Sequence, residues 1–346
     1  MSNLLDQLNE QKRKVDFDTF DISVKELVSM AFDKLINIAP EYQRRFRWDE
    51  RRQSVFIESV FLGIPVPSLY TAANQDGTWE LIDGVQRLST LIHFVGEQKL
   101  RDRIGLKDAL RLTELQKLSE FNMLTFEELP QSVQLQFLLK PLKVTTVSDK
   151  SDLVVRFDLF ERLNTGGISL TPQEIRACIY RGEFSEFLRR MAKDPNFRHL
   201  VRLPRDAEHD GTREELVLKF FAYLHEYQQF DHLVTEFLNS YMKHASERFD
   251  YAANEQLFAM VCKTLTPLFP DGIVRRGSRT RTPANLYEAV CVGAALALNA
   301  KAKITKKNIA EWIDSDELRR VTGEGSNTRQ NVARRIEFCR DQFLGR

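Results

Sequence analysis

The spacing of apolar residues changes at Asp83-Gly84. Before this point, the short apolar runs "IPVPSLYTAA" and "WELI" are separated by the turn-forming residues "NQDG", which predicts two strands. After it, apolar residues recur on one helix face, at Val85, Leu88, Leu91, Ile92 and Val95. The pattern therefore predicts a strand that ends at Asp83-Gly84 and a helix that begins directly after it.

The same kind of pattern divides the rest of the chain. "PLKVTTV" predicts a further strand, and helical spacing is found over 106–122 and 126–137. Farther along only helical patterns occur, at 183–193, 212–230, 232–248, 252–266, 283–299, 305–314 and 327–344. We therefore expect an α+β fold, with an N-terminal extension over 1–20, an α+β domain over 21–182 and an all-α domain over 183–346.

Composition narrows the class of protein. A chain of 346 residues has room for about two domains, and a formal net charge of +1 means that attraction to nucleic acid must come from local patches. The N-terminus is too polar for a secretory signal, and the apolar run "LYEAVCVGAALALNA" is shorter than the ~20 residues of a membrane span. The four cysteines form no C-x-x-C pair, which disfavours a zinc ribbon, so we expect a cytoplasmic protein.

The first helical turn after Asp83-Gly84 carries an amide and a cation. The first N–H groups of a helix have no internal partner and form an electropositive end, which a preceding glycine leaves open to approach. Arg87 is unfavourable there unless an anion intervenes, so Gly84, Gln86 and Arg87 are candidates to hold a phosphate. Asp83 can hold Mg²⁺ or cap the helix. The alternative is that Asp83 only caps the helix and Arg87 is only solvated.

Three further segments carry candidate chemistry. "EYQRRFRWDERR" interleaves arginines with aromatic residues, which suits phosphate binding and base stacking or simply the start of a surface helix. "FERLNTGG" offers a loop with backbone donors, or only a helix end, and "SLTPQEIR" carries a capping box. A basic loop suited to DNA phosphates, or only to solvent, contains Arg275, Arg276, Arg279 and Arg281.

Together these segments resemble the family that forms the N-terminal part of GmrSD-type restriction systems. The matching residues are Tyr42-Gln43-Arg44, Phe46 and Trp48, then "IDGVQRLST", then "FERLNTGG" with Leu170 and Glu174. The resemblance covers roughly 20–220 and implies a ParB/sulfiredoxin-like nucleotide-binding fold with a small mixed sheet, followed by helices. Most relatives carry glutamine where this chain has Val85, and often tyrosine where it has Phe46. Val85 lies on the apolar helix face, so we expect little effect on phosphate binding, but the missing amide puts base choice or catalysis in doubt.

The resemblance implies a role for each motif. Gly84-Val85-Gln86-Arg87 matches a Gly-x-x-Arg box that holds nucleotide phosphates in ParB-like proteins, and Arg44 would add a second clamp. Asp83 and Glu161 would hold Mg²⁺ or orient water, with Asp83, Arg87 and Glu161 as the catalytic set. A loop that closes over the nucleotide would comprise Asn164, Thr165, Gly166 and Gly167.

These roles predict an NTP hydrolase that senses DNA in a restriction or anti-phage system. No HNH-type nuclease motif follows residue 220, so we expect a separate nuclease subunit as partner. One alternative is a non-catalytic ParB-like switch that binds nucleotide or DNA. Another is a metal-dependent DNA nicking endonuclease that uses the same acidic residues, and the weakest is a purely structural helical scaffold.

Overall fold

The computed structural model describes most of the chain and divides it into two compact units. The described residues are 4–6, 9, 16–37, 48–74, 76–148, 157, 160–162, 171–204, 207, 210–277, 281–300, 304–323 and 325–346. The first unit is Met1–Ser169 and the second is Leu170–Arg346.

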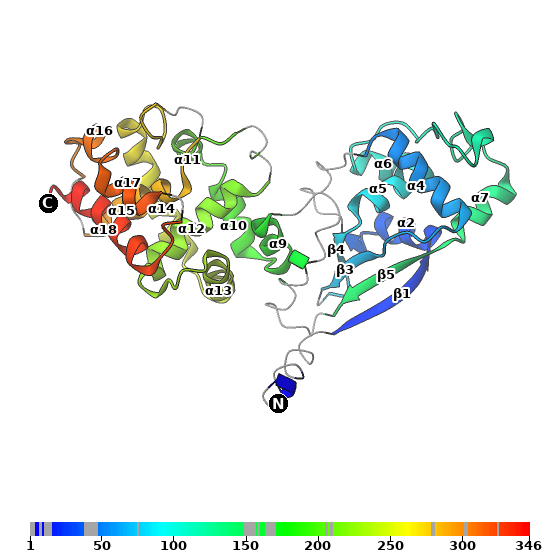
Figure 1. Ribbon diagram of the computed structural model, residues 1–346, viewed down its shortest axis with the longest axis horizontal. Helices are drawn as coiled ribbons and strands as arrows, with labels where there is room; N and C mark the ends of the chain where they lie inside the picture. The colour runs from blue at the N-terminus through cyan, green and yellow to red at the C-terminus, as the bar shows by residue number, and fades with distance from the viewer. Residues whose placement is uncertain are drawn as a thin grey trace. The chain divides into compact units, whose positions relative to one another are not determined.

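A five-stranded mixed sheet organises the first unit (Figure 1). Its strands are β1 (Phe17–Ser23), β2 (Ile36–Asn37), β3 (Leu69–Ala73), β4 (Trp79–Asp83) and β5 (Pro141–Val147). They lie in the order β1-β5-β3-β4-β2, with β3 parallel to β5 and antiparallel to β4. The expected strands on either side of "NQDG" are β3 and β4, and "PLKVTTV" is β5, which confirms the α+β class.

Helices pack against this sheet through a shared apolar core. They are α2 (Val24–Phe32), α4 (Glu50–Leu62), α5 (Val85–Val95), α6 (Gln98–Arg103) and α7 (Gln131–Leu138), with a short 3-10 helix at Ser119–Phe121. The core joins Leu27 of α2, Ile57 of α4 and Leu91 of α5 to Leu81 and Val144 of the sheet. Because α5 packs against both α2 and α4, its first turn is held in place at the end of β4.

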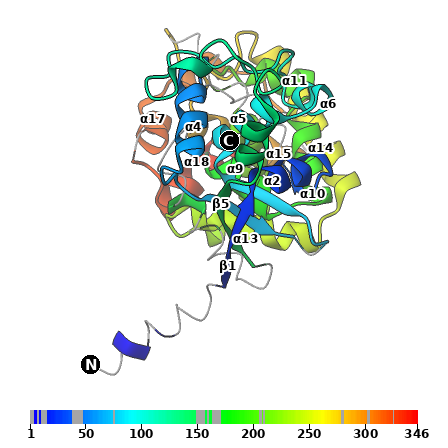
Figure 2. The same cartoon turned by 90° about the vertical axis from the view of Figure 1, so that its right-hand side faces the viewer.

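Two parts of the first unit differ from expectation. β1 begins at Phe17, inside the segment expected to be an extension, and forms the margin of the sheet (Figure 2). The helix expected over 106–122 is wrong, because the described segment contains only one 3-10 turn. Tertiary partners replace helical bonds there: Glu58 accepts the N–H groups of Lys117 and Leu118 at 2.8 Å each, and Asn122 bonds both the N–H and the carbonyl of Leu115.

The regular elements that the structure describes in the second unit are all helices, as expected. Its helices are α9 (Pro172–Ile179), α10 (Glu183–Met191), α11 (Pro195–Leu200), α12 (Thr212–Glu226), α13 (Val234–Glu247), α14 (Tyr251–Leu265), α15 (Ala284–Asn299), α16 (Ile309–Trp312), α17 (Asp316–Thr322) and α18 (Arg329–Leu344), with 3-10 turns at Tyr227–Gln229 and Thr266–Leu268. The apolar run of the sequence is α15, which α12, α14 and α18 surround. Within the described ranges, no helix has the length and apolar character needed to cross a membrane.

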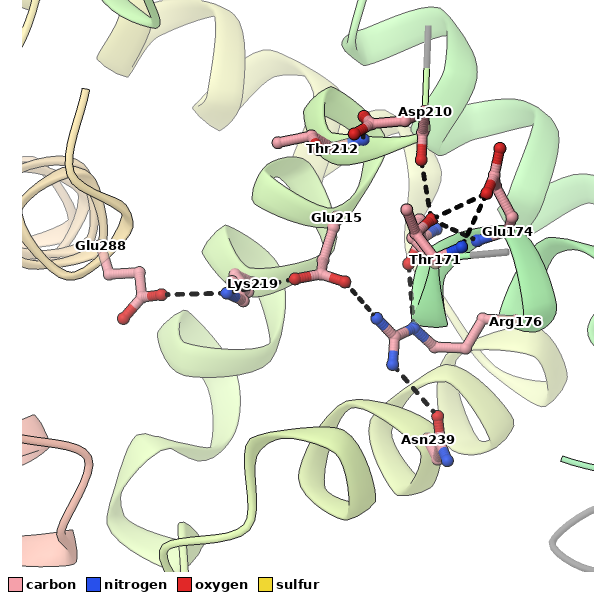
Figure 3. Close-up of polar contacts among 10 residues, drawn as sticks. Thr171, Glu174, Arg176, Asp210, Thr212, Glu215, Lys219, Asn239 and Glu288 are labelled. Atoms are coloured by element: carbon pink, nitrogen blue, oxygen red, sulfur yellow. Dashed lines mark hydrogen bonds and ion pairs between the residues drawn. The ribbon is translucent and has the colours of Figure 1, made fainter. Parts of the chain in front are cut away.

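The short helix α9 belongs to the second unit, although the sequence pattern placed the division after it. It begins with the expected capping box, in which Thr171 and Glu174 bond each other's backbone N–H groups (Figure 3). Arg176, only 1% exposed, then donates to Glu215 of α12 at 2.5 Å and to Asn239 of α13 at 3.3 Å. These buried polar contacts tie α9 to the helical unit.

Candidate nucleotide-binding site

The junction between β4 and α5 is built around Gly84. This residue is the N-cap of α5, with φ +104°, and no side chain among the described residues caps the helix there. Asp83 is therefore not the N-cap, which corrects one of the two roles considered for it. A Cβ atom at Gly84 would lie 2.2 Å from Leu69 Cδ2 and 3.3 Å from Arg87 Nε, so only glycine fits this position without displacing its neighbours.

Arg87 folds back under Gly84. Its Nη2 donates to Asp83 Oδ2 at 2.6 Å and to the Ser68 carbonyl at 3.3 Å, and its side chain is only 12% exposed. Nε is buried and has no hydrogen-bond partner in the described structure. Arg87 is thus a mostly buried cation with one unsatisfied donor, which differs from the solvated side chain considered as the alternative.

Gln86 connects this junction to the arginine-rich segment that precedes α4. Its Oε1 accepts the Trp48 N–H at 3.1 Å, and Gln53 Nε2 donates to the Trp48 carbonyl at 2.9 Å. Gln53 Oε1 in turn lies 2.7 Å from His93 Nδ1, so the amide geometry assigns a proton to Nδ1. The two motifs that are far apart in sequence are therefore joined by one chain of hydrogen bonds, which sequence spacing alone does not reveal.

Burial dominates the electrostatics of His93. Only 7% of this residue is exposed, and desolvation lowers its pKa below the ordinary value of 6.5, although the Asp108 backbone acts in the opposite direction. The imidazole is therefore neutral at pH 7 and serves the hydrogen-bond chain between α4 and α5.

An open cleft lies beside Trp48 at the start of α4. It has a volume of about 400 Å³ and is lined by Trp48, Asp49, Arg51, Arg52, Val55 and Phe56. The Trp48 and Phe56 rings meet edge to face at 5.7 Å, and Asp49 caps α4 by accepting the Arg52 N–H at 2.8 Å. The interleaved arginines and aromatics in the sequence were the only signal for this cleft. Arg44, the expected second clamp, lies outside the described residues.

The remaining candidates for metal and nucleotide contacts are only partly described. Glu161 is an exposed helical residue, whereas Asn164, Thr165, Gly166 and Gly167 lie outside the described residues. Asp83 already shares its carboxylate with Arg87, so a cation bound by Asp83 would compete with the guanidinium. In the described parts of the chain, no group of three or more His, Cys, Asp or Glu side chains has an arrangement that could hold a metal ion.

The basic loop of the second unit contains two kinds of arginine. Arg275 donates to the Ile313 carbonyl and to the Thr322 hydroxyl, so its guanidinium is engaged in joining the loop to later helices. Arg276 and Arg281 are exposed, and Arg279 lies outside the described residues. Among the described members of this group, the exposed cations available to a phosphate backbone are therefore Arg276 and Arg281.

Comparison with known families and structures gives one match. Residues 24–181 match the family model described as GmrSD restriction endonuclease, N-terminal domain. No curated protein and no solved structure matches the chain. The matched span includes α2, the β4–α5 junction and the capped helix α9, and β1 precedes it. Residues 24–181 of this chain therefore belong to the family of GmrSD restriction endonuclease N-terminal domains.

Proposed function

We propose that the chain is the nucleotide-binding, NTP-hydrolysing component of a restriction system. The family supports a role in restriction, and one observation supports the site. Arg87 is buried against Gly84 at the uncapped start of α5. Among the described residues, one of its donors is unsatisfied and its ionic partner is the Asp83 carboxylate. Such a cation beside open helix N–H groups has the chemistry that recognises phosphate.

The Asp83–Arg87 ion pair assigns complementary tasks to the two residues. A phosphate oxygen that takes the place of the Asp83 carboxylate would retain the charge-assisted bond at Nη2 and offer an acceptor to Nε. Asp83, once released, would orient water or a magnesium ion that arrives with the triphosphate. Magnesium would neutralise phosphate charge, and positioning with such neutralisation supplies most of the catalysis in phosphoryl transfer.

The proposal also assigns roles to residues outside this junction. Arg44 would clamp a second phosphate, Glu161 would assist with metal or water, and the loop Asn164–Gly167 would close over the nucleotide. The DNA backbone would be contacted by Arg276, Arg281 and Arg279. DNA affinity would then fall as the salt concentration rises, and it would fall more steeply the more phosphates these arginines neutralise. A separate nuclease subunit would cut the DNA.

Phosphate release by the purified chain tests this function. The assay compares ATP, GTP, CTP and UTP with Mg²⁺, with and without DNA, for wild type, Arg87→Ala and Arg87→Lys. Arg101→Ala is the matched control, because Arg101 is also buried but donates to the Gly96 carbonyl and Gln98 near the end of α5. We expect the wild type and Arg101→Ala to hydrolyse nucleotide and Arg87→Ala to have lost this activity. Stimulation of hydrolysis by DNA would identify the chain as a DNA sensor.

A non-catalytic switch is the second candidate. The observation that favours it is the engagement of Asp83 by Arg87, because this carboxylate is then not free to hold a metal ion. Tight nucleotide binding by the wild-type chain without phosphate release, again lost in Arg87→Ala, would replace the hydrolase with the switch. A folded wild-type chain that neither binds nor hydrolyses any of the four nucleotides would contradict both functions.

A further inference from the structure

The cleft at the start of α4 combines aromatic surfaces with arginines. Trp48, Val55 and Phe56 supply its apolar lining, and the buried Phe56 ring meets the half-buried Trp48 ring edge to face at 5.7 Å. Arg51 and Arg52 also line the cleft, and both are exposed. Sites for small molecules typically have volumes of roughly 300–1,000 Å³ and pair apolar walls with a few polar groups. The cleft, at about 400 Å³, has the size and composition of such a site.

The two arginines of the cleft differ in how they are engaged. Arg51 pairs with Glu114 at 3.2 Å, and both of these side chains are largely exposed. The Arg52 backbone N–H bonds Asp49, but in the part of the chain that the structure describes its guanidinium has no ion pair. A guanidinium can stack on a planar ring and can also bond a phosphate. Arg52 is therefore a cation that a ligand in this cleft could use.

A backbone contact joins this cleft to the start of α5. The Trp48 N–H donates to Gln86 Oε1 at 3.1 Å. Gln86 lies between Gly84 and Arg87 in the sequence, so the cleft is one glutamine side chain away from the first turn of this helix. The bond uses the Trp48 backbone, and the ring of the same residue lines the cleft. A nucleotide with its phosphates at Gly84 and Arg87 would therefore have an aromatic cleft near its base.

We propose that the cleft beside Trp48 binds the base of the nucleoside triphosphate. This role rests on the proposed function, because it needs the phosphates at the β4–α5 junction. The base would stack on the Trp48 ring, and Arg52 would add a cation–π contact to the stacked base. Every base has a π-face, so stacking of this kind selects only weakly among bases. We therefore expect ATP, GTP, CTP and UTP to bind with similar affinities.

Titration with a nucleotide and with its phosphate chain alone separates base contacts from phosphate contacts. ATP and inorganic triphosphate are titrated calorimetrically, in EDTA, into wild type, Trp48→Leu, Trp48→Phe and Arg87→Ala. Both substitutions at Trp48 keep the backbone N–H that bonds Gln86. We expect Trp48→Leu to weaken ATP binding about five- to hundredfold, as for loss of one base–aromatic stack, and to leave triphosphate binding unchanged. Trp48→Phe retains a ring and should lose less affinity for ATP.

Arg87→Ala should instead weaken the binding of both ligands, because it removes a phosphate contact. If it does so while Trp48→Leu weakens neither ligand, or both equally, the phosphates bind at the junction but the base does not bind in this cleft. That result would overturn the base site and leave the proposed function standing. A folded wild-type chain that binds neither ligand would overturn both.

Tryptophan fluorescence gives a second test that leaves Trp48 unchanged. The chain contains three tryptophans, and Trp79→Phe with Trp312→Phe makes Trp48 the single one. Circular dichroism verifies that this variant folds. ATP at a saturating concentration should quench the Trp48 emission, whereas inorganic triphosphate should leave it unchanged, because only a base can cover the ring. Equal emission with and without bound ATP would overturn the proposal.

Discussion

At Gly84, the absence of a side chain lets β4 turn directly into α5. The sequence predicts this junction because the apolar period changes there. It singles out Gly84 because a glycine leaves the first helix N–H groups open to approach, and Arg87 because a cation in the first turn opposes the helix dipole. It does not predict that Arg87 turns back onto Asp83, because that contact depends on the backbone turn at Gly84. It also does not predict that Gln86 bonds Trp48, because that contact depends on how α4 and α5 pack.

Replacement of Gly84 by alanine should destabilise the first unit. The backbone at φ +104° strains any residue with a Cβ atom, and that atom would lie 2.2 Å from Leu69 Cδ2. We expect the backbone strain alone to lower the free energy of unfolding, measured with urea, by about 1–3 kcal/mol. Leu69→Ala in the same chain should relieve the overlap but not the strain, so full recovery in the double variant would contradict this account.

Asp83→Asn should separate nucleotide binding from hydrolysis. The amide removes the negative charge that pairs with Arg87, so a phosphate no longer displaces a carboxylate. We expect nucleotide binding, measured by titration calorimetry in the presence of EDTA, to be at least as tight as in wild type. Phosphate release in the presence of Mg²⁺ should be lost. Weaker binding in this variant would show that Asp83 helps to hold the nucleotide rather than competing with it.

At the scale of elements, contacts between distant segments decide where periodicity misleads. The leucines of 106–122 have helical spacing, yet Glu58 and Asn122 bond the backbone of this segment in an extended, looped path. The sequence pattern does not predict β1, because aspartate is a residue type rarely found in strands. In addition, the first five residues of β1 are exposed, so the strand shows no alternation of buried and exposed positions. The capped start of α9 is predicted correctly, because a capping box needs only neighbouring residues.

The hydrogen-bond chain between α4 and α5 predicts a dependence of stability on pH. His93 has a lowered pKa in the folded state, mainly through burial, so below pH 6.5 the unfolded chain binds the proton more readily. Stability attributable to this group should be constant above about 6.5 and fall as the pH decreases below it. His93→Asn retains a donor toward Gln53 without titrating, and its urea midpoint should fall less between pH 7 and 5 than that of wild type.

At the scale of the whole molecule, the matched family domain and the compact units do not end at the same place. Residues 24–181 match the family, whereas α9 packs with the helical unit that begins at Leu170. Local sequence could not place this division, because helical spacing is the same on both sides of it. The buried network that binds α9 continues from Glu215 to Lys219, at 3.2 Å, and from Lys219 to Glu288, at 3.6 Å (Figure 3). Glu288 also pairs with Arg335.

Breaking this network at α9 should destabilise the helical unit selectively. Burial acts to lower the pKa of Lys219, but Glu288 and Glu215 outweigh it and raise the pKa, so the charges depend on one another. Arg176→Ala leaves Glu215 without one of its cations. We expect this variant to lower the free energy of unfolding by about 3–5 kcal/mol. Arg189→Ala, which removes the exposed pair with Glu186, should cost at most about 1 kcal/mol in the same calorimetric scan. Equal effects would contradict a structural role for the network.

The most direct test of the central claim is nucleotide affinity at the β4–α5 junction. Titration of a fluorescent nucleoside triphosphate into the purified chain measures this affinity without requiring hydrolysis, DNA or a partner subunit. We predict that the wild-type chain binds the nucleotide saturably and that Arg87→Ala weakens this affinity about ten- to hundredfold, as expected for loss of a charged hydrogen bond. The control variant Arg101→Ala should bind as tightly as wild type. Equal affinity of wild type and Arg87→Ala, with both chains folded, would show that the phosphates do not bind at this junction.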